Sequence, residues 1–145
     1  MEKDIHSSVM YLMSGPAYLP YLVVSLRTLR DFWFGKVVVF SWPESWDILN
    51  NYIARDRRLS VEPILIKPKY RGKNAQFIHK IEIALEGEFF SPKELVLYLD
   101  ADTAVNGSLD YLFFLAKNGF VATQFCKWNT NTPIIRKRIA DLYKS

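Results

Sequence analysis

The chain has 145 residues, half of them apolar and 23% charged, a composition that excludes an intrinsically disordered protein. Its formal net charge of +4 is only mildly basic, and no helical pattern carries a long basic face, so nucleic acid is not expected as a partner. A single cysteine, Cys126, excludes an internal disulfide framework and favours a reducing compartment.

Nothing in the sequence predicts export or membrane insertion. The sequence begins Met-Glu-Lys-Asp and lacks the basic stretch and apolar core of a signal peptide. No apolar run approaches the length that crosses a bilayer. We therefore expect a cytoplasmic protein with no membrane span.

Short apolar runs alternate with helical patterns from the start of the chain. Residues 9–13 predict a buried strand, which a Ser-Gly-Pro sequence ends. Apolar residues at helical spacing from 19 to 33 predict a helix with Pro20 in its first turn, and residues 37–40 predict a second strand.

The second helix and third strand follow. Ser41 and Glu44 have the spacing of a capping box and predict a helix start. The expected apolar stripe of that helix is Trp46, Leu49, Tyr52 and Ile53. Residues 61–66 predict a strand, which Pro63 places near an edge of the sheet. After a basic loop at 67–74, a third helix is marked by Phe77, Ile78, Ile81, Ala84 and Leu85.

Residues 95–99 predict a fourth strand that is apolar throughout, as expected for a strand covered on both faces. A fourth helix is expected at 109–117, capped by Ser108 and ended by Gly119. Residues 120–125 predict a fifth strand.

A last helix is expected from residue 133 to the end. The alternation of strand and helix predicts a single α/β domain over residues 1–145, with a Rossmann-like, mostly parallel sheet and helices on both faces. Because no closing element follows the last helix, a complete small domain and a fragment of a longer protein both stay open.

An acidic pair, Asp100 and Asp102, directly follows the apolar fourth strand. In extended backbone, residues two apart point to the same side, so both carboxylates would face one space, and Ala101 adds no bulk between them. Ligands of open parallel sheets bind outside the carboxyl ends of the strands. Two adjacent carboxylates suit Mg²⁺ or Mn²⁺ with phosphate oxygens, although such pairs also occur as structural caps.

The segment Leu-Tyr-Leu-Asp-Ala-Asp-Thr at 97–103, followed by Leu-Asp-Tyr-Leu-Phe at 109–113, resembles the DxD region of GT-A-fold glycosyltransferases, particularly the glycogenin-like family 8. Residues 9–18 and 25–29 resemble the first strand, nucleotide loop and first helix of that family. Residues 77–85 resemble its helix with a basic residue that faces the donor. The resemblance spans most of the chain, and the DxD segment is its specific part.

This resemblance implies that the chain binds a nucleotide-diphospho-sugar donor, usually a UDP-sugar, and transfers the sugar to an acceptor that the sequence does not name. It implies a Mn²⁺ or Mg²⁺ ion held by Asp100 and Asp102. Asp102 is the firmer metal ligand, while Asp100 shares the metal or holds the ribose. The expected donor-binding residues are Ser14, Gly15, Tyr18, Lys80 and Asp100.

Two of these residues have an alternative structural interpretation. Tyr18 either stacks on the base or belongs to the apolar face of the first helix. Lys80 either meets the phosphates or the base, or is a solvated helix lysine. The same choice applies to the basic residues, which are solvated loops or a positive rim near an anionic ligand. They are Arg55, Arg57, Arg58, Lys67, Lys69, Arg71 and Lys73.

The sequence also departs from the family pattern. Family members continue well past this length, and a later segment supplies a third metal ligand, usually a histidine, and most of the acceptor site. No histidine follows Asp102. The alternative is therefore a non-catalytic or truncated nucleotide-sugar-binding module, and the exposed apolar surface of a shortened chain would favour a homo-oligomer.

Two other enzyme classes share part of this pattern. Haloacid dehalogenase-like phosphatases also use Asp-x-Asp-x-Thr, but that motif ends the first strand of their core. Sugar nucleotidyltransferases carry a glycine-rich basic loop after the first strand, which residues 14–18 lack. A catalytic thiol is not expected, because neither His6 nor His79 forms a recognisable signature with Cys126.

Overall fold

The computed structural model describes residues 6–85 and 88–117. Within them, one sheet has the strand order β3-β2-β1-β4, and all of its pairings are parallel. The strands are β1 Ser7–Met13, β2 Lys36–Ser41, β3 Val61–Leu65 and β4 Leu95–Tyr98. The Rossmann-like α/β fold predicted from the sequence is confirmed, as is the edge position of the strand that contains Pro63.

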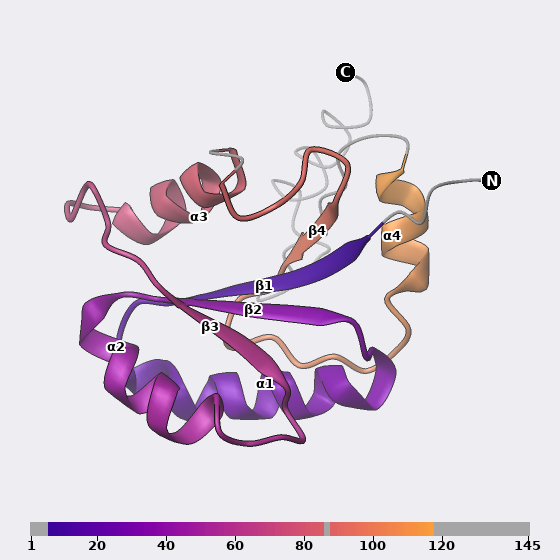
Figure 1. Ribbon diagram of the computed structural model, residues 1–145, viewed down its shortest axis with the longest axis horizontal. Coiled ribbons are helices and arrows are strands. Elements are labelled where there is room, and N and C mark those ends of the chain that lie inside the picture. The colour runs from indigo at the N-terminus through magenta and orange to yellow at the C-terminus, as the bar shows by residue number, and fades with distance from the viewer. Residues whose placement is uncertain (1–5, 86–87, 118–145) are drawn as a thin grey trace, which may run out of the picture.

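Helices cover both faces of this sheet, as predicted (Figure 1). The helical elements are the 3₁₀ turn η1 Pro16–Tyr18, α1 Leu19–Phe32, α2 Pro43–Ile48, the π-helical segment η2 Leu49–Ile53, α3 Ala75–Leu85 and α4 Asp110–Ala116. In Figure 1, α1 and α2 lie on one side of the sheet and α3 lies on the other.

The central strand β1 divides two apolar cores. Its residues Val9, Tyr11 and Met13 pack with α1, η2 and α4, whereas Met10 and Leu12 pack with α3 on the opposite face. All five are buried because neighbouring strands flank β1 and helices cover both of its faces. A continuous apolar run is what a central parallel strand requires.

The strand order creates a topological switch point. From β1 the chain adds β2 and then β3 on one side, and after α3 it returns to add β4 on the other side of β1. The crossover connections therefore diverge between β1 and β4. The crevice at the carboxyl ends of such a pair is where open α/β sheets bind ligands.

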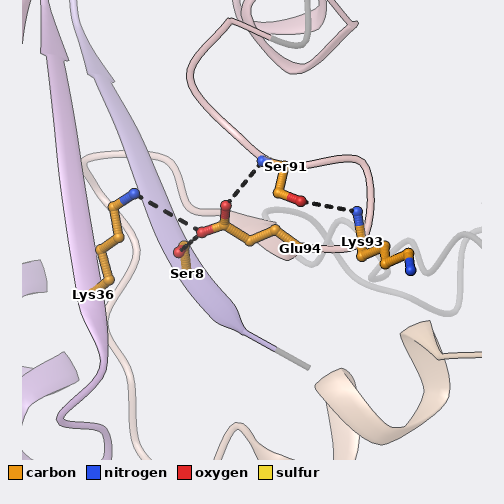
Figure 2. A network of polar contacts seen from close by, with 5 residues as sticks. All are labelled: Ser8, Lys36, Ser91, Lys93 and Glu94. Carbon is orange, nitrogen blue, oxygen red and sulfur yellow. Dashed lines mark hydrogen bonds and ion pairs between the residues drawn. The ribbon is translucent and has the colours of Figure 1, made fainter. Parts of the chain in front are cut away.

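A buried carboxylate joins β4 to the sheet at the opposite, amino-terminal ends of the strands (Figure 2). Glu94 directly precedes β4, and its Oε1 accepts a hydrogen bond from the Ser8 hydroxyl and lies 3.9 Å from Lys36 Nζ. Its Oε2 accepts a hydrogen bond of 3.1 Å from the backbone N–H of Ser91. In the same turn, the backbone N–H of Lys93 donates to the Ser91 hydroxyl.

Two local expectations were wrong. Ser41 is the last residue of β2, its hydroxyl donates to the Trp42 carbonyl, and Trp42 is the N-cap of α2, so no capping box forms. Tyr52 is exposed, because the wider turn of η2 aligns Leu49 with Ile53 instead. β4 lies at an edge of the described sheet and is half-buried, and its residues pack alternately into the cores on both faces, as expected.

The buried side of α3 also differs from the expected stripe. Ala75, His79 and Ile83 face the sheet, whereas the larger apolar residues Phe77, Ile78 and Ile81 are exposed. The imidazole is tolerated in the core because its Nδ1 accepts a 2.8 Å hydrogen bond from Trp42 Nε1–H.

The helix predicted at 109–117 is α4, which begins at Asp110 with Leu109 and not Ser108 as its N-cap, although the Ser108 hydroxyl accepts a hydrogen bond from the Asp110 N–H at 3.2 Å. The predicted stop at Gly119, the fifth strand at 120–125, Cys126 and the helix from residue 133 lie outside the described residues. Among residues 6–85 and 88–117, no helix combines the length and apolar character needed to cross a membrane.

Candidate functional site

A cavity of about 160 Å³ lies at the switch point, where β1 and β4 end and α3 passes. Its lining residues are Leu12, Ser14, Tyr18, Gln76, Phe77, Lys80, Tyr98, Asp100, Ala101 and Asp102. The structure thus brings Ser14, Tyr18, Lys80, Asp100 and Asp102 together from three separate parts of the sequence. Of the predicted donor-binding and metal-binding residues, Gly15 alone does not line the cavity.

A tight turn directly after β4 presents the two aspartates. The Thr103 N–H donates to the Asp100 carbonyl at 3.0 Å, which closes the turn over residues 100–103. Ala101 between the carboxylates is buried in the apolar core. The extended backbone expected for this pair is wrong, but both carboxylates still line the cavity, because Ala101 is the residue that turns into the core.

The segment after the turn is tied to α1. The Val105 N–H donates to Thr28 Oγ1 at 2.9 Å, and the Thr28 hydroxyl donates to the Ser25 carbonyl at 2.9 Å. Val105 is itself buried in the core that α1 and α4 share. These contacts hold the carboxyl side of the acidic turn in place against α1.

The two carboxylates have different surroundings. Oδ1 of Asp100 accepts hydrogen bonds from Lys80 Nζ at 3.2 Å and from the Tyr98 hydroxyl at 2.9 Å. Asp102 is exposed and makes no hydrogen bond or ion pair with any residue that the structure describes. The second carboxylate is thus the one that is free to accept a ligand.

Lys80 is not a solvated helix lysine. Its side chain is only 17% exposed, and Nζ lies 4.3 Å from the ring centroids of both Phe77 and Tyr98. Such contacts stabilise an ammonium group over aromatic faces. Lys80 is therefore held between two rings with its charge directed at Asp100.

Tyr98 was missed by sequence reasoning, although its position contained the signal. It lies two residues before Asp100 on the approach to the same edge of the sheet. Burial raises the pKa of its hydroxyl above the ordinary value of 10.0, and the charges of Asp100 and Asp102 raise it further. The Tyr98 hydroxyl therefore stays protonated and donates a hydrogen bond, and both carboxylates act on it electrostatically.

The loop after β1 lines a second side of the cavity. Tyr18 is 41% exposed and lies outside the buried face of α1, which consists of Leu22, Ser25, Leu26 and Leu29. The apolar-face alternative for Tyr18 is therefore wrong. Gly15 has an extended backbone with φ of −162°, and a side chain there would meet only the Tyr18 ring at 4.0 Å, so glycine is not required at this position.

The donor set fits a hard divalent cation. It offers carboxylate oxygens on one turn, and one of the two carboxylates has no protein partner among the described residues. No group of three or more metal-binding side chains occurs in residues 6–85 and 88–117. Two carboxylates are typical for Mg²⁺ or Mn²⁺ that keeps water or phosphate oxygens as its other ligands.

The two basic stretches do not form a rim around this cavity, because none of their residues lines it. Arg58 pairs with Asp56 at 3.0 Å, and Arg57 lines a separate depression of about 640 Å³ near the starts of β2 and β3. Arg71 pairs with Glu44 and lies 5.5 Å from the ring centroid of Trp42.

Fold and cavity define an open, parallel α/β sheet with an acidic cavity at its switch point. No protein-family model matches the chain, and no curated protein matches it. Among solved structures, the chain is similar to S. aureus TarS at 19% identity and a TM-score of 0.48, over 86% of this chain and 24% of that one. The chain spans about a quarter of that structure, and a likeness this weak assigns no function.

Proposed function

We propose that the chain binds a nucleotide-diphospho-sugar, specifically a UDP-sugar, through a Mn²⁺ or Mg²⁺ ion, as the donor-binding part of a GT-A glycosyltransferase. The observation that carries the proposal is the carboxylate of Asp102, unpaired within the part of the chain that the structure describes, beside Asp100 in a cavity at the switch point of a parallel sheet. The family 8 assignment rests on the sequence resemblance alone.

Charge balance favours a metal with a diphosphate over either one alone. Among the described residues that line the cavity, Asp100, Asp102 and Lys80 together carry one net negative charge. A divalent cation converts this into one net positive charge, which attracts a diphosphate. A diphosphate without the cation would meet two carboxylates and only one ammonium group.

The roles of the lining residues follow from their chemistry. Asp102 and Asp100 would hold the cation, Lys80 would meet the phosphates, and Ser14 and Tyr18 would contact the nucleoside, with the ring of Tyr18 available for stacking. When bound, the cation supplies a Lewis acid that neutralises charge on the departing nucleoside diphosphate. The acceptor is unassigned, and cytoplasmic residence stays a prediction.

A second candidate, a binding module without transfer activity, is favoured by the size of the cavity. At about 160 Å³ it is smaller than the roughly 300–1,000 Å³ of typical small-molecule sites, so it holds only part of a nucleotide sugar. A phosphatase of the haloacid dehalogenase type is not favoured, since the acidic motif follows β4 and not the first strand.

Isothermal titration calorimetry with UDP, with and without Mn²⁺, tests donor binding. The wild type is expected to bind UDP only with the metal, and Asp102→Ala is expected to lose that binding. Asp47→Ala, which removes an exposed aspartate on α2, is the matched control and should bind like the wild type. A wild type that shows no metal-dependent binding would refute the proposal.

Release of UDP from a panel of UDP-sugars separates the two candidates. UDP release that requires both Mn²⁺ and Asp102 would support an enzyme. Tight metal-dependent binding with no release from any donor would support the module.

A further inference from the structure

One oxygen of Asp100 takes both of the hydrogen bonds that this carboxylate accepts. Lys80 Nζ and the Tyr98 hydroxyl donate to Oδ1, at 3.2 Å and 2.9 Å, and Oδ2 accepts none from the residues that the structure describes. The carboxylate is thus held on one side and open on the other. Its side chain is 58% exposed, so the open side is accessible.

The ammonium of Lys80 reduces the attraction of this carboxylate for a cation. A positive charge 3.2 Å from Oδ1 offsets most of the negative charge of Asp100 and would repel a metal ion placed at Oδ2. In the free protein, and counting the described residues, Asp102 is then the carboxylate of the pair whose charge is not compensated. A metal ion without its nucleotide should therefore bind weakly.

The surroundings of Lys80 allow its charged end to change partners. Nζ is within 4.3 Å of the ring centroids of Phe77 and Tyr98, which attract an ammonium without fixing one hydrogen-bonding direction. Lys80 also lines the same cavity as both aspartates. A small rotation of its end would bring the ammonium to an anion in the cavity while its contacts with the rings persist.

We propose that Lys80 is an exchangeable counter-ion, which pairs with Asp100 in the free protein and moves to the diphosphate when the metal–nucleotide complex binds. This inference rests on the proposed function and adds that metal binding and nucleotide binding are coupled. The departure of Lys80 leaves Asp100 available to the metal ion. Metal and nucleotide therefore bind cooperatively, and each strengthens the binding of the other by the same factor.

The test measures Mn²⁺ binding by the electron paramagnetic resonance signal of free Mn²⁺, with and without UDP. For the wild type, UDP should tighten Mn²⁺ binding by about tenfold or more, a coupling that is typical in size for linked sites. Lys80→Met keeps an unbranched apolar side chain without the charge. It should bind Mn²⁺ alone about five- to tenfold more tightly than the wild type, and UDP should then add less.

Lys73→Met is the matched control. It removes the same charge from an exposed lysine that does not line the cavity, so it should bind Mn²⁺ like the wild type. Circular dichroism melting verifies that the variants fold, and Lys80→Gln repeats the test if Lys80→Met does not fold.

The outcomes separate this inference from the proposed function. If the wild type binds UDP with Mn²⁺ but the Lys80 variants bind Mn²⁺ alone no more tightly than the wild type, the exchange is refuted and the donor site stands. If the wild type binds Mn²⁺ neither alone nor with UDP, the proposed function fails, and the exchange fails with it.

Discussion

Glu94 and Asp100 flank the same short strand, β4, and their surroundings are opposite. The Glu94 side chain is 9% exposed, and both of its oxygens accept hydrogen bonds. Asp100 is 58% exposed, and within the described residues one of its oxygens accepts no hydrogen bond and its neighbour Asp102 has no partner. Two acidic residues six positions apart thus differ in burial and in how far their oxygens are satisfied.

The difference shows how a structural carboxylate is distinguished from a ligand-binding one. A largely buried carboxylate whose two oxygens already accept hydrogen bonds stabilises the fold, and it has no oxygen left to bind a ligand. An exposed carboxylate with unused oxygens keeps that capacity, and it costs little desolvation. Their places also differ, because Asp100 lies at the carboxyl end of a parallel strand, whereas Glu94 lies at the amino end.

The largest effect on stability is expected from Glu94→Gln. The amide keeps the shape of the side chain, and it can accept from the Ser91 N–H while its NH₂ group donates to the Ser8 hydroxyl, so both contacts can re-form without the negative charge. Replacing two charge-assisted hydrogen bonds with neutral ones should lower the free energy of unfolding by about 1.5 kcal/mol. Urea unfolding followed by circular dichroism measures this loss.

Asp102→Asn is the matched substitution at the other end of β4. Because Asp102 is exposed and unpaired within the described residues, its loss should change the free energy of unfolding by less than about 0.5 kcal/mol. Equal losses for Glu94→Gln and Asp102→Asn would remove the distinction between a structural and a ligand-binding carboxylate in this protein.

The second expected effect is alkaline destabilisation through Tyr98. Burial and the neighbouring Asp100 raise the pKa of its hydroxyl above 10.0, and burial raises the pKa of Tyr11 to about 12. The unfolded chain therefore releases these protons at lower pH than the native chain does. Stability is fully present below pH 10 and falls above it, by about 1 kcal/mol per pH unit for each tyrosine.

Thermal melting from pH 8 to pH 11 measures this dependence, and Tyr98→Phe should flatten the decline above pH 10. Tyr52→Phe is the control, since Tyr52 is 70% exposed and should leave the decline unchanged. If the melting temperature of Tyr98→Phe falls with pH as steeply as that of the wild type, the Tyr98 hydroxyl is not buried in the way that the structure shows.

The sequence predicted the sheet well because its central strands are apolar on both faces. Residues 9–13 and 37–40 lie within β1 and β2, and Pro63 correctly indicated an edge. The buried face of α3 could not be predicted in this way. His79 is buried with its ring accepting a hydrogen bond from Trp42, which is far away in the sequence.

The candidate site was predicted in part. Asp100 and Asp102 were found because the end of a buried strand is a recognisable position, and Lys80 and Tyr18 were found through the family resemblance. That Lys80 and Tyr98 share one oxygen of Asp100 depends on α3 lying over β4, which periodicity does not reveal. Metal and nucleotide binding stay predictions for this site.

The smallest effect is expected from Lys36→Met, at the rim of the Glu94 cluster. The Lys36 side chain is 45% exposed, and its Nζ lies 3.9 Å from Glu94 Oε1 and 5.7 Å from the Phe90 ring centroid. An exposed ion pair at this distance contributes about 0.5 kcal/mol, so this variant should lose far less stability than Glu94→Gln in the same urea titration. A loss as large as that of Glu94→Gln would mean that charge pairing, and not the two hydrogen bonds from Ser8 and Ser91, holds this carboxylate in place.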